Sequence, residues 1–135
     1  MKIDGGCHCG YIAYEAEVDP DRVRICHCTD CQTLSGSAFR TVAFTNPGSF
    51  KLVAGEVAIY VKTAESGNKR QQSFCPKCGT PIFSASPDNE PNKVHSLRVG
   101  SVRQRDRLIP KEQSWMRSSQ DWLGEMNALP RSERG

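Results

Sequence analysis

The sequence has few apolar residues for its length. Only 37% of its 135 residues are hydrophobic and 7% aromatic, and neither an internal repeat nor a shift in composition divides the chain. A domain of this size buries roughly two thirds of the surface of its unfolded chain. A structural zinc can add about 10–16 kcal/mol of apparent binding free energy to folding. We therefore expect a single domain over residues 1–129 that metal helps to stabilise, with a frayed tail over residues 130–135.

The sequence also lacks any apolar run long enough to cross a membrane, and residues 1–6 lack the apolar core of a signal peptide. We therefore expect a cytoplasmic protein that binds no membrane. In a reducing cytosol, cysteines bind metal more often than they form disulfides. The odd number of cysteines, seven, also argues against complete disulfide pairing.

The sequence also lacks a large excess of charge of either sign, since 18 lysines and arginines are nearly balanced by 15 acidic residues. One basic run stands out, interrupted by Asp106 and with Trp115 as its only nearby aromatic residue. The run consists of Arg98, Arg103, Arg105, Arg107 and Lys111. Surfaces that bind single-stranded nucleic acid combine positive charge with aromatic stacking platforms. We therefore expect a solvated edge here and no nucleic-acid partner.

What the sequence does have is seven cysteines at short spacings. They form the groups Cys7-x-Cys9, Cys26-x-Cys28-x-x-Cys31 and Cys75-x-x-Cys78. Tetrahedral zinc holds its sulfur ligands at about 2.3 Å from the metal, hence roughly 3.8 Å from one another, which such spacings allow. Seven thiolates can form one closed four-cysteine site and one three-cysteine site with an open position. A closed site is structural, whereas an open site is where zinc takes part in chemistry.

Spacing alone leaves the grouping of the cysteines open. Cys28 and Cys31 could join the pair at residues 75 and 78 in a zinc ribbon. That grouping would leave over three cysteines that lie far apart in the sequence, and it would split the compact cluster at residues 26–31. Both consequences weigh against the ribbon.

Alternation of apolar and polar residues predicts a mainly β fold. In residues 11–18, one face carries Ile12, Tyr14, Ala16 and Val18, which predicts a half-buried strand before a turn at residues 19–21. A short strand at residues 23–25 would then lead into Cys26. Further strands are expected at residues 39–44, 50–53, 58–62, 71–74, 81–84 and 94–99.

Two short helices are also predicted. Thr29 can cap one helical turn, with Gln32 completing a capping box and Gly36 ending the turn. Near the C-terminus, Ser118 or Ser119 can cap a second helix. Its apolar stripe, which we expect to pack on the domain's own core, consists of Trp122, Leu123, Met126 and Leu129.

The order of these motifs and their amino-acid sequences resemble those of a known family. Residues 6–10 read Gly-Cys-His-Cys-Gly, residues 26–31 read Cys-His-Cys-Thr-Asp-Cys, and residues 74–83 read Phe-Cys-Pro-Lys-Cys-Gly-Thr-Pro-Ile-Phe. Together with Ser-Gly-Ser at residues 35–37, this pattern resembles the glutathione-dependent formaldehyde-activating enzyme family, which includes the centromere-protein-V-like proteins. The resemblance runs from about residue 5 to residue 83.

The resemblance implies a mostly antiparallel β fold of the β-tent type with two zinc ions. It implies two ligand sets: Cys7, Cys9, Cys75 and Cys78 for a structural zinc, and Cys26, Cys28 and Cys31 for a second zinc with an open position. It also implies the formation of S-(hydroxymethyl)glutathione from glutathione and formaldehyde, which is carbon–sulfur lyase chemistry in the reverse sense. Three thiolates suit a soft fourth ligand such as the thiol of the substrate.

One departure from the family concerns the substrate. Members commonly have a basic pair after the third cysteine of the cluster, whereas here Gln32 and Thr33 follow Cys31. Without those cations we expect glutathione to bind weakly and a less anionic thiol to bind better. The basic run that begins at Arg98 could instead attract the carboxylates of glutathione.

Among the other candidate residues, His27 lies between two predicted ligands and could carry a proton. Strand alternation would, however, aim its ring away from the metal. We assign no chemistry to His8 or His95, and residues 35–37 either line the site or only end the helix. The alternative to an enzyme is a non-catalytic zinc-stabilised binding or scaffold module, which a fourth protein ligand on the second zinc would favour.

Overall fold

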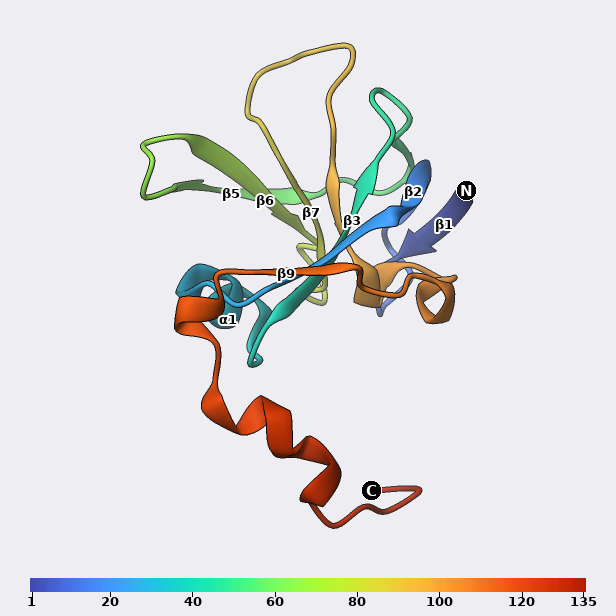
Figure 1. Ribbon diagram of the computed structural model, residues 1–135. Helices are drawn as coiled ribbons and strands as arrows, with labels where there is room; N and C mark the ends of the chain where they lie inside the picture. The colour runs from blue at the N-terminus through green and yellow to red at the C-terminus, as the bar shows by residue number, and fades with distance from the viewer.

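The fold is built on nine β-strands (Figure 1). The structure, a computed structural model, describes all residues from 1 to 135. The order is β1-β2-β3-β8-β7-β6-β5, with β4 and β9 also paired to β2. All pairings are antiparallel except that of β9 with β2, so the predicted mainly β, antiparallel fold is confirmed. The strands are β1 (Lys2–Gly6), β2 (Ala13–Cys26), β3 (Arg40–Thr45), β4 (Lys51–Ala54), β5 (Ala58–Thr63), β6 (Lys69–Phe74), β7 (Pro81–Ala85), β8 (Ser96–Arg98) and β9 (Glu112–Ser114).

Strand β2 is 14 residues long and connects two sets of strands. Its first half pairs with β1 and β4, and its second half pairs with β3 and β9. The register shifts between Val18 and Val23, and such an irregularity bends a strand without ending it. The predicted turn at residues 19–21 was therefore wrong, because β2 continues through Pro20 to deliver Cys26.

The core is formed by the alternating residues of β2 and the strands around them. Ile12, Tyr14, Ala16 and Val18 are each at most 6% exposed, as their spacing predicted. Fully burying an aliphatic side chain contributes roughly 1.5–3 kcal/mol to stability. The same cluster contains Ile3, Val23, Ala43, Ile82, Phe83, Leu97 and Val102.

One α-helix and four short 3₁₀ helices complete the fold. They are α1 (Thr29–Ser35), η1 (Val99–Ser101), η2 (Arg105–Arg107), η3 (Met116–Ser118) and η4 (Asp121–Ala128). The predicted cap of α1 was wrong by one residue: Cys28 is the N-cap, and its sulfur accepts a hydrogen bond from the backbone N–H of Cys31. Gly36 ends the helix at a φ of 66°, as predicted.

The six strands predicted after Cys26 are all present, and no end differs from its predicted position by more than two residues. Two strands had no signal in the sequence. Strand β1 contains Gly5 and Gly6, which weaken any strand pattern, and β9 is only three residues long. No helix has the length and apolar character needed to span a membrane.

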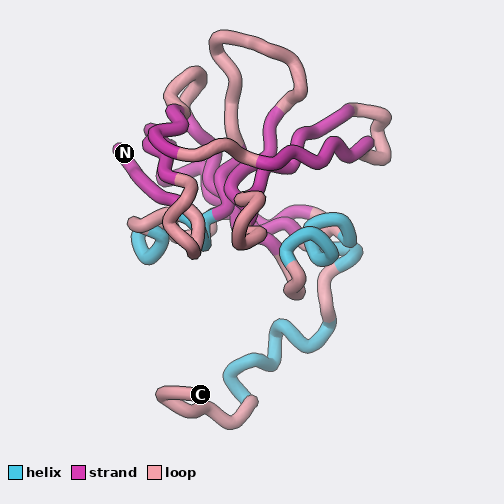
Figure 2. Tube along the Cα trace, turned by 180° about the vertical axis from the view of Figure 1, so that it is seen from behind, coloured by secondary structure: helices cyan, strands magenta, loops and turns pink.

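The C-terminal segment, residues 118–135, extends away from the sheet (Figures 1 and 2). The expectation that its apolar stripe packs on the core was wrong, because Trp122 and Met126 are half exposed and Leu129 is 58% exposed. The segment is a 3₁₀ helix, which has three residues per turn. That period aligns Leu123, Met126 and Leu129 but places Trp122 on another face, so the predicted α-helical stripe does not form.

We predict that Gly5→Ala lowers the free energy of unfolding by about 1–3 kcal/mol, the usual cost of overpacking. A Cβ at this position would overlap the backbone oxygen of Ser101 and the hydroxyl of Tyr14. The control is Gly100→Ala, whose Cβ would meet no atom within 4 Å. Urea unfolding of both variants measures the difference, and equal stabilities would contradict the prediction.

Candidate metal centres and the cavity beside them

Four cysteines from two motifs far apart in the sequence converge in one cluster. The sulfurs of Cys7, Cys9, Cys75 and Cys78 all lie within 4.8 Å of one another. The Sγ–Sγ distance is 3.5 Å between Cys7 and Cys9 and 3.8 Å between Cys9 and Cys75. These separations match the roughly 3.8 Å of sulfurs around a tetrahedral zinc. The cluster could therefore hold a metal ion.

Two tight turns bring these sulfurs together. Gly10 donates a backbone hydrogen bond to the carbonyl of Cys7, and Gly79 donates one to the carbonyl of Cys75. Both glycines have positive φ, 85° and 78°, which side chains disfavour. The chain thus turns back on itself after each Cys-x-Cys or Cys-x-x-Cys pair.

Hydrogen-bonding groups contact three of the four sulfurs in this cluster. The backbone N–H of Ile12 donates to Cys7 Sγ at 3.1 Å, and that of Lys77 donates to Cys75 Sγ at 3.4 Å. The hydroxyl of Thr80 lies 3.1 Å from Cys78 Sγ, and this contact together with the Thr80 backbone lowers the pKa of Cys78 to about 5. A deprotonated sulfur is the form that binds metal.

The other three cysteines form a second cluster at the junction of β2 and α1. The sulfurs of Cys26, Cys28 and Cys31 lie within 4.8 Å of one another, with no fourth histidine, cysteine or carboxylate in the group. The contact with Cys31, followed by hydrogen bonds from the Cys28 backbone and the Ser114 hydroxyl, lowers the pKa of Cys26 to about 4, against the effect of burial. The same contact raises the pKa of Cys31. The structure therefore groups the cysteines as four and three, and the zinc-ribbon grouping does not form.

A cavity of about 280 Å³ opens beside the three-cysteine cluster. Five cationic residues line it, from β2, β3, β5, β6 and β8, and the lining contains no carboxylate. They are Arg24, Arg40, Lys62, Arg70 and Arg98. Arg24 and Lys62 are paired at the rim with Glu112 and Asp30, at 2.8 and 2.9 Å. The other three arginines make no ion pair, so the cavity carries an excess of positive charge.

Arg98 is the largest departure from the sequence prediction. It was expected on a solvated edge, but it is only 8% exposed and faces the cysteine cavity. Burial, with the nearby charges of Arg40 and Arg70, lowers the pKa of Arg98 to about 9, while the cysteines oppose the shift. The prediction failed because Arg98 is the last residue of β8 and pairs opposite Val42, which no run of charges reveals.

Sequence reasoning also missed the polar residues that line this cavity from the middle of the sheet. Arg40 and Gln72 lie in predicted strands and Arg70 lies just before one, but only the pairing of the strands puts all three on the cysteine face. Arg40 lies opposite Cys26, and Gln72 lies opposite Ser84. Strand alternation puts Arg70 and Gln72 on one face of β6, but β6 is polar at both faces, so its sequence does not indicate which face lines a cavity.

Gln32 and Thr33, which replace the expected basic pair, lie outside this cavity. The Nε2 of Gln32 donates to the carbonyls of His27 and Ser118, at 2.8 and 3.0 Å, and its Oε1 accepts from Gln120 at 2.9 Å. Gln32 therefore connects residues 26–31, which contain the three cysteines, to the C-terminal segment. Thr33 is exposed.

The histidines contribute little to the cysteine cavity. His27 is 2% exposed, and its Nε2 lies 2.8 Å from Gln113 Oε1 on the side of the C-terminal segment. It does not line the cavity, so its role as proton carrier stays a prediction. His95 stacks on Phe50 at 4.4 Å, and burial lowers its pKa to about 4. His8 contacts Thr80 through its backbone N–H alone.

Comparison with known proteins agrees with this geometry. Residues 2–118 match the model of a family described as glutathione-dependent formaldehyde-activating enzyme. A crystal structure of a Rhodobacter sphaeroides protein superposes with a TM-score of 0.61 at 19% sequence identity. The match covers 82% of this chain and 99% of that chain, and at this identity it supports the fold alone.

The grouping of the sulfurs predicts different fates for two serine variants. Cys75→Ser should leave most of the protein unfolded, because Cys75 is buried and joins segments 66 residues apart in the sequence. Cys31→Ser should remain folded and retain about one zinc per chain, because the four-cysteine cluster is intact. Circular dichroism and elemental analysis of both proteins check this. Equal unfolding of the two variants would contradict the grouping into a structural and an open site.

Proposed function

The chain belongs to the glutathione-dependent formaldehyde-activating enzyme family, and from this premise we propose that it is a zinc-dependent carbon–sulfur lyase acting on adducts of a thiol and an aldehyde. The observation that carries the proposal is a three-cysteine cluster that faces a cavity lined by three arginines without ion pairs. The thiol is glutathione or a related anionic thiol. The aldehyde in the family's reaction is formaldehyde.

Both clusters fit zinc by their donor sets. Four thiols from Cys7, Cys9, Cys75 and Cys78 suit a closed structural site, and the three thiols at residues 26–31 suit an open site. Zinc bound at the open site would act as a Lewis acid that lowers the pKa of a substrate thiol. We thus propose two zinc ions per chain.

The reaction needs little more than a positioned thiolate and carbonyl. The thiolate sulfur donates an electron pair to the aldehyde carbon and forms the C–S bond, while the carbonyl π electrons move to oxygen, which takes up a proton. The reverse direction breaks the C–S bond and returns thiol and aldehyde. The protein binds and orients the two reactants, and this positioning can lower the activation free energy by several kcal/mol.

The arginines supply the cations that the sequence lacks after Cys31. Arg40 and Arg98 are both buried and lie in the wall of the cavity, and Arg70 is half-buried nearby. Guanidinium groups bind carboxylates through paired hydrogen bonds. We therefore propose that the two carboxylates of glutathione bind this arginine group, which replaces the expectation of weak glutathione binding.

Cobalt substitution tests the open position. Glutathione should intensify the sulfur-to-cobalt charge-transfer absorption of the cobalt-loaded wild-type protein, because a further sulfur joins the three-cysteine set. The Cys31→Ser protein, with the second site empty, should show no such change. An unchanged spectrum across several thiols, with both sites loaded, would favour the non-catalytic zinc-stabilised module.

A second variant tests the arginine group. Arg70→Gln should raise the Kd for glutathione about tenfold or more, because a hydrogen bond to a charged group contributes roughly 1.5–3 kcal/mol. The control is Lys69→Gln, which removes the same charge from an exposed neighbour in β6 that does not line the cavity. Isothermal titration calorimetry measures both, and equal affinities would contradict the assigned role of Arg70.

A further inference from the structure

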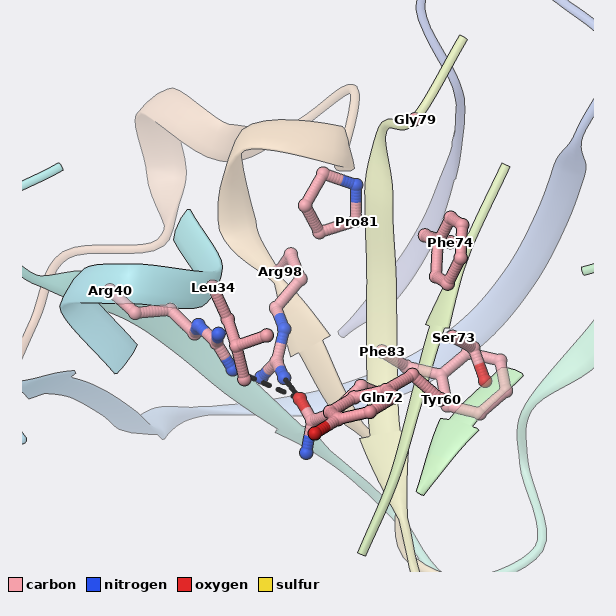
Figure 3. Close-up of a pocket in the computed structure, with 10 residues that line it drawn as sticks. All are labelled: Leu34, Arg40, Tyr60, Gln72, Ser73, Phe74, Gly79, Pro81, Phe83 and Arg98. Atoms are coloured by element: carbon pink, nitrogen blue, oxygen red, sulfur yellow. Dashed lines mark hydrogen bonds between the residues drawn. The ribbon is translucent and has the colours of Figure 1, made fainter. Parts of the chain in front are cut away.

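Figure 3 shows a second cavity, of about 420 Å³, which shares lining residues with the cysteine cavity. Its walls are mostly apolar and come from α1, β5, β6 and β7. They include Leu34, Tyr60, Phe74, Pro81 and Phe83. Nothing in the proposed reaction of glutathione with formaldehyde uses this space.

The two cavities share one polar wall. Arg40, Gln72 and Arg98 line both of them. The Oε1 of Gln72 accepts from Arg40 Nη1 at 3.2 Å and from Arg98 Nη2 at 2.7 Å, so the three side chains hold one another in place (Figure 3). A ligand bound to the guanidinium groups from the cysteine side is thus adjacent to the apolar walls on the other side.

Helix α1 links the two cavities as well. Cys31 lines the first cavity and Leu34 the second, and residues three apart lie on one face of a helix. The ion pair between Lys62 Nζ and Asp30 Oδ2, at 2.9 Å, holds β5 against α1. Leu34 of α1 and Tyr60 of β5 both line the second cavity. The apolar space therefore begins one helical turn from a sulfur of the cysteine cluster.

We propose that the second cavity receives the apolar substituent of an aldehyde larger than formaldehyde, bonded to the substrate sulfur. This inference rests on the proposed function. The adduct is an S-(1-hydroxyalkyl) thiol, formed as above: sulfur adds to the aldehyde carbon, and the carbonyl oxygen takes up a proton. Formaldehyde adds a single carbon and would leave the cavity empty, whereas a medium-length alkyl chain would cover its apolar walls.

Stable S-alkyl glutathiones, which carry the chain on the same sulfur, provide the test. Each fully buried methylene should tighten binding about fourfold, so S-hexylglutathione should bind at least about 30-fold more tightly than S-methylglutathione even if part of the chain stays exposed. Calorimetric titration of the zinc-loaded protein measures both Kd values. Equal affinities for the two ligands, or no binding of either while glutathione binds, would overturn the inference and leave the proposed function in place.

Matched variants test whether the alkyl chain of the ligand lies in the second cavity. Leu34→Gln and Tyr60→Ser should each reduce the ratio of the two affinities at least about threefold, because each adds polarity or removes apolar surface from one wall. The controls Thr33→Gln and Ile59→Ser alter exposed neighbours that line neither cavity, and they should keep the wild-type ratio. A chain-length effect that the cavity variants leave unchanged would also overturn the inference. Failure of glutathione itself to bind the wild-type protein would overturn the proposed function, and this inference with it.

Discussion

Close packing of cysteine sulfurs is the constraint on which the rest of this structure depends. Four sulfurs within 4.8 Å join the end of β1 to the turn before β7, and three more join the end of β2 to α1. Thiolates at this distance repel one another unless a cation lies among them or donors surround them. The chain provides donors at both clusters, including the N–H groups of Ile12, Lys77 and Cys31. A small apolar core can therefore be sufficient, because metal binding and folding would be coupled.

Strand β2 runs from one cysteine cluster to the other. Gly6, in β1, pairs with Ala13 at one end of β2, and Cys26 lies at the other end of the same strand. The shift of register between Val18 and Val23 changes which residues of β2 and β3 pair, and in the new register Arg40 lies opposite Cys26. An irregularity in one strand thus determines which side chains face the open cluster.

Local patterns in the sequence predicted much of the fold, and the resemblance to a known family predicted the grouping of the cysteines, but neither predicted the lining of the cavity. Alternation around Tyr14 and the stop at Gly36 were visible because each depends on residues only a few positions apart. Arg98 was misplaced because its surroundings come from β3 and β6, 26 or more residues away. Continuation of β2 through Pro20 and the 3₁₀ form of the C-terminal segment likewise depend on context that short windows do not contain.

The charges of the cavity give a reason for an anionic thiol. Arg40, Arg70 and Arg98 contribute three positive charges, and the pKa of Arg98, about 9, leaves it protonated at neutral pH. Three thiolates around a divalent ion carry a net single negative charge, so the proposed loaded cavity retains about two positive charges. Buried charge without a counter-ion is costly, and the lining offers no carboxylate to balance it. Glutathione bound as its thiolate brings a net charge of about minus two from two carboxylates, one ammonium and one sulfur. The charge that the cavity lacks is therefore the charge that the family's thiol carries, although the basic pair expected after Cys31 is absent.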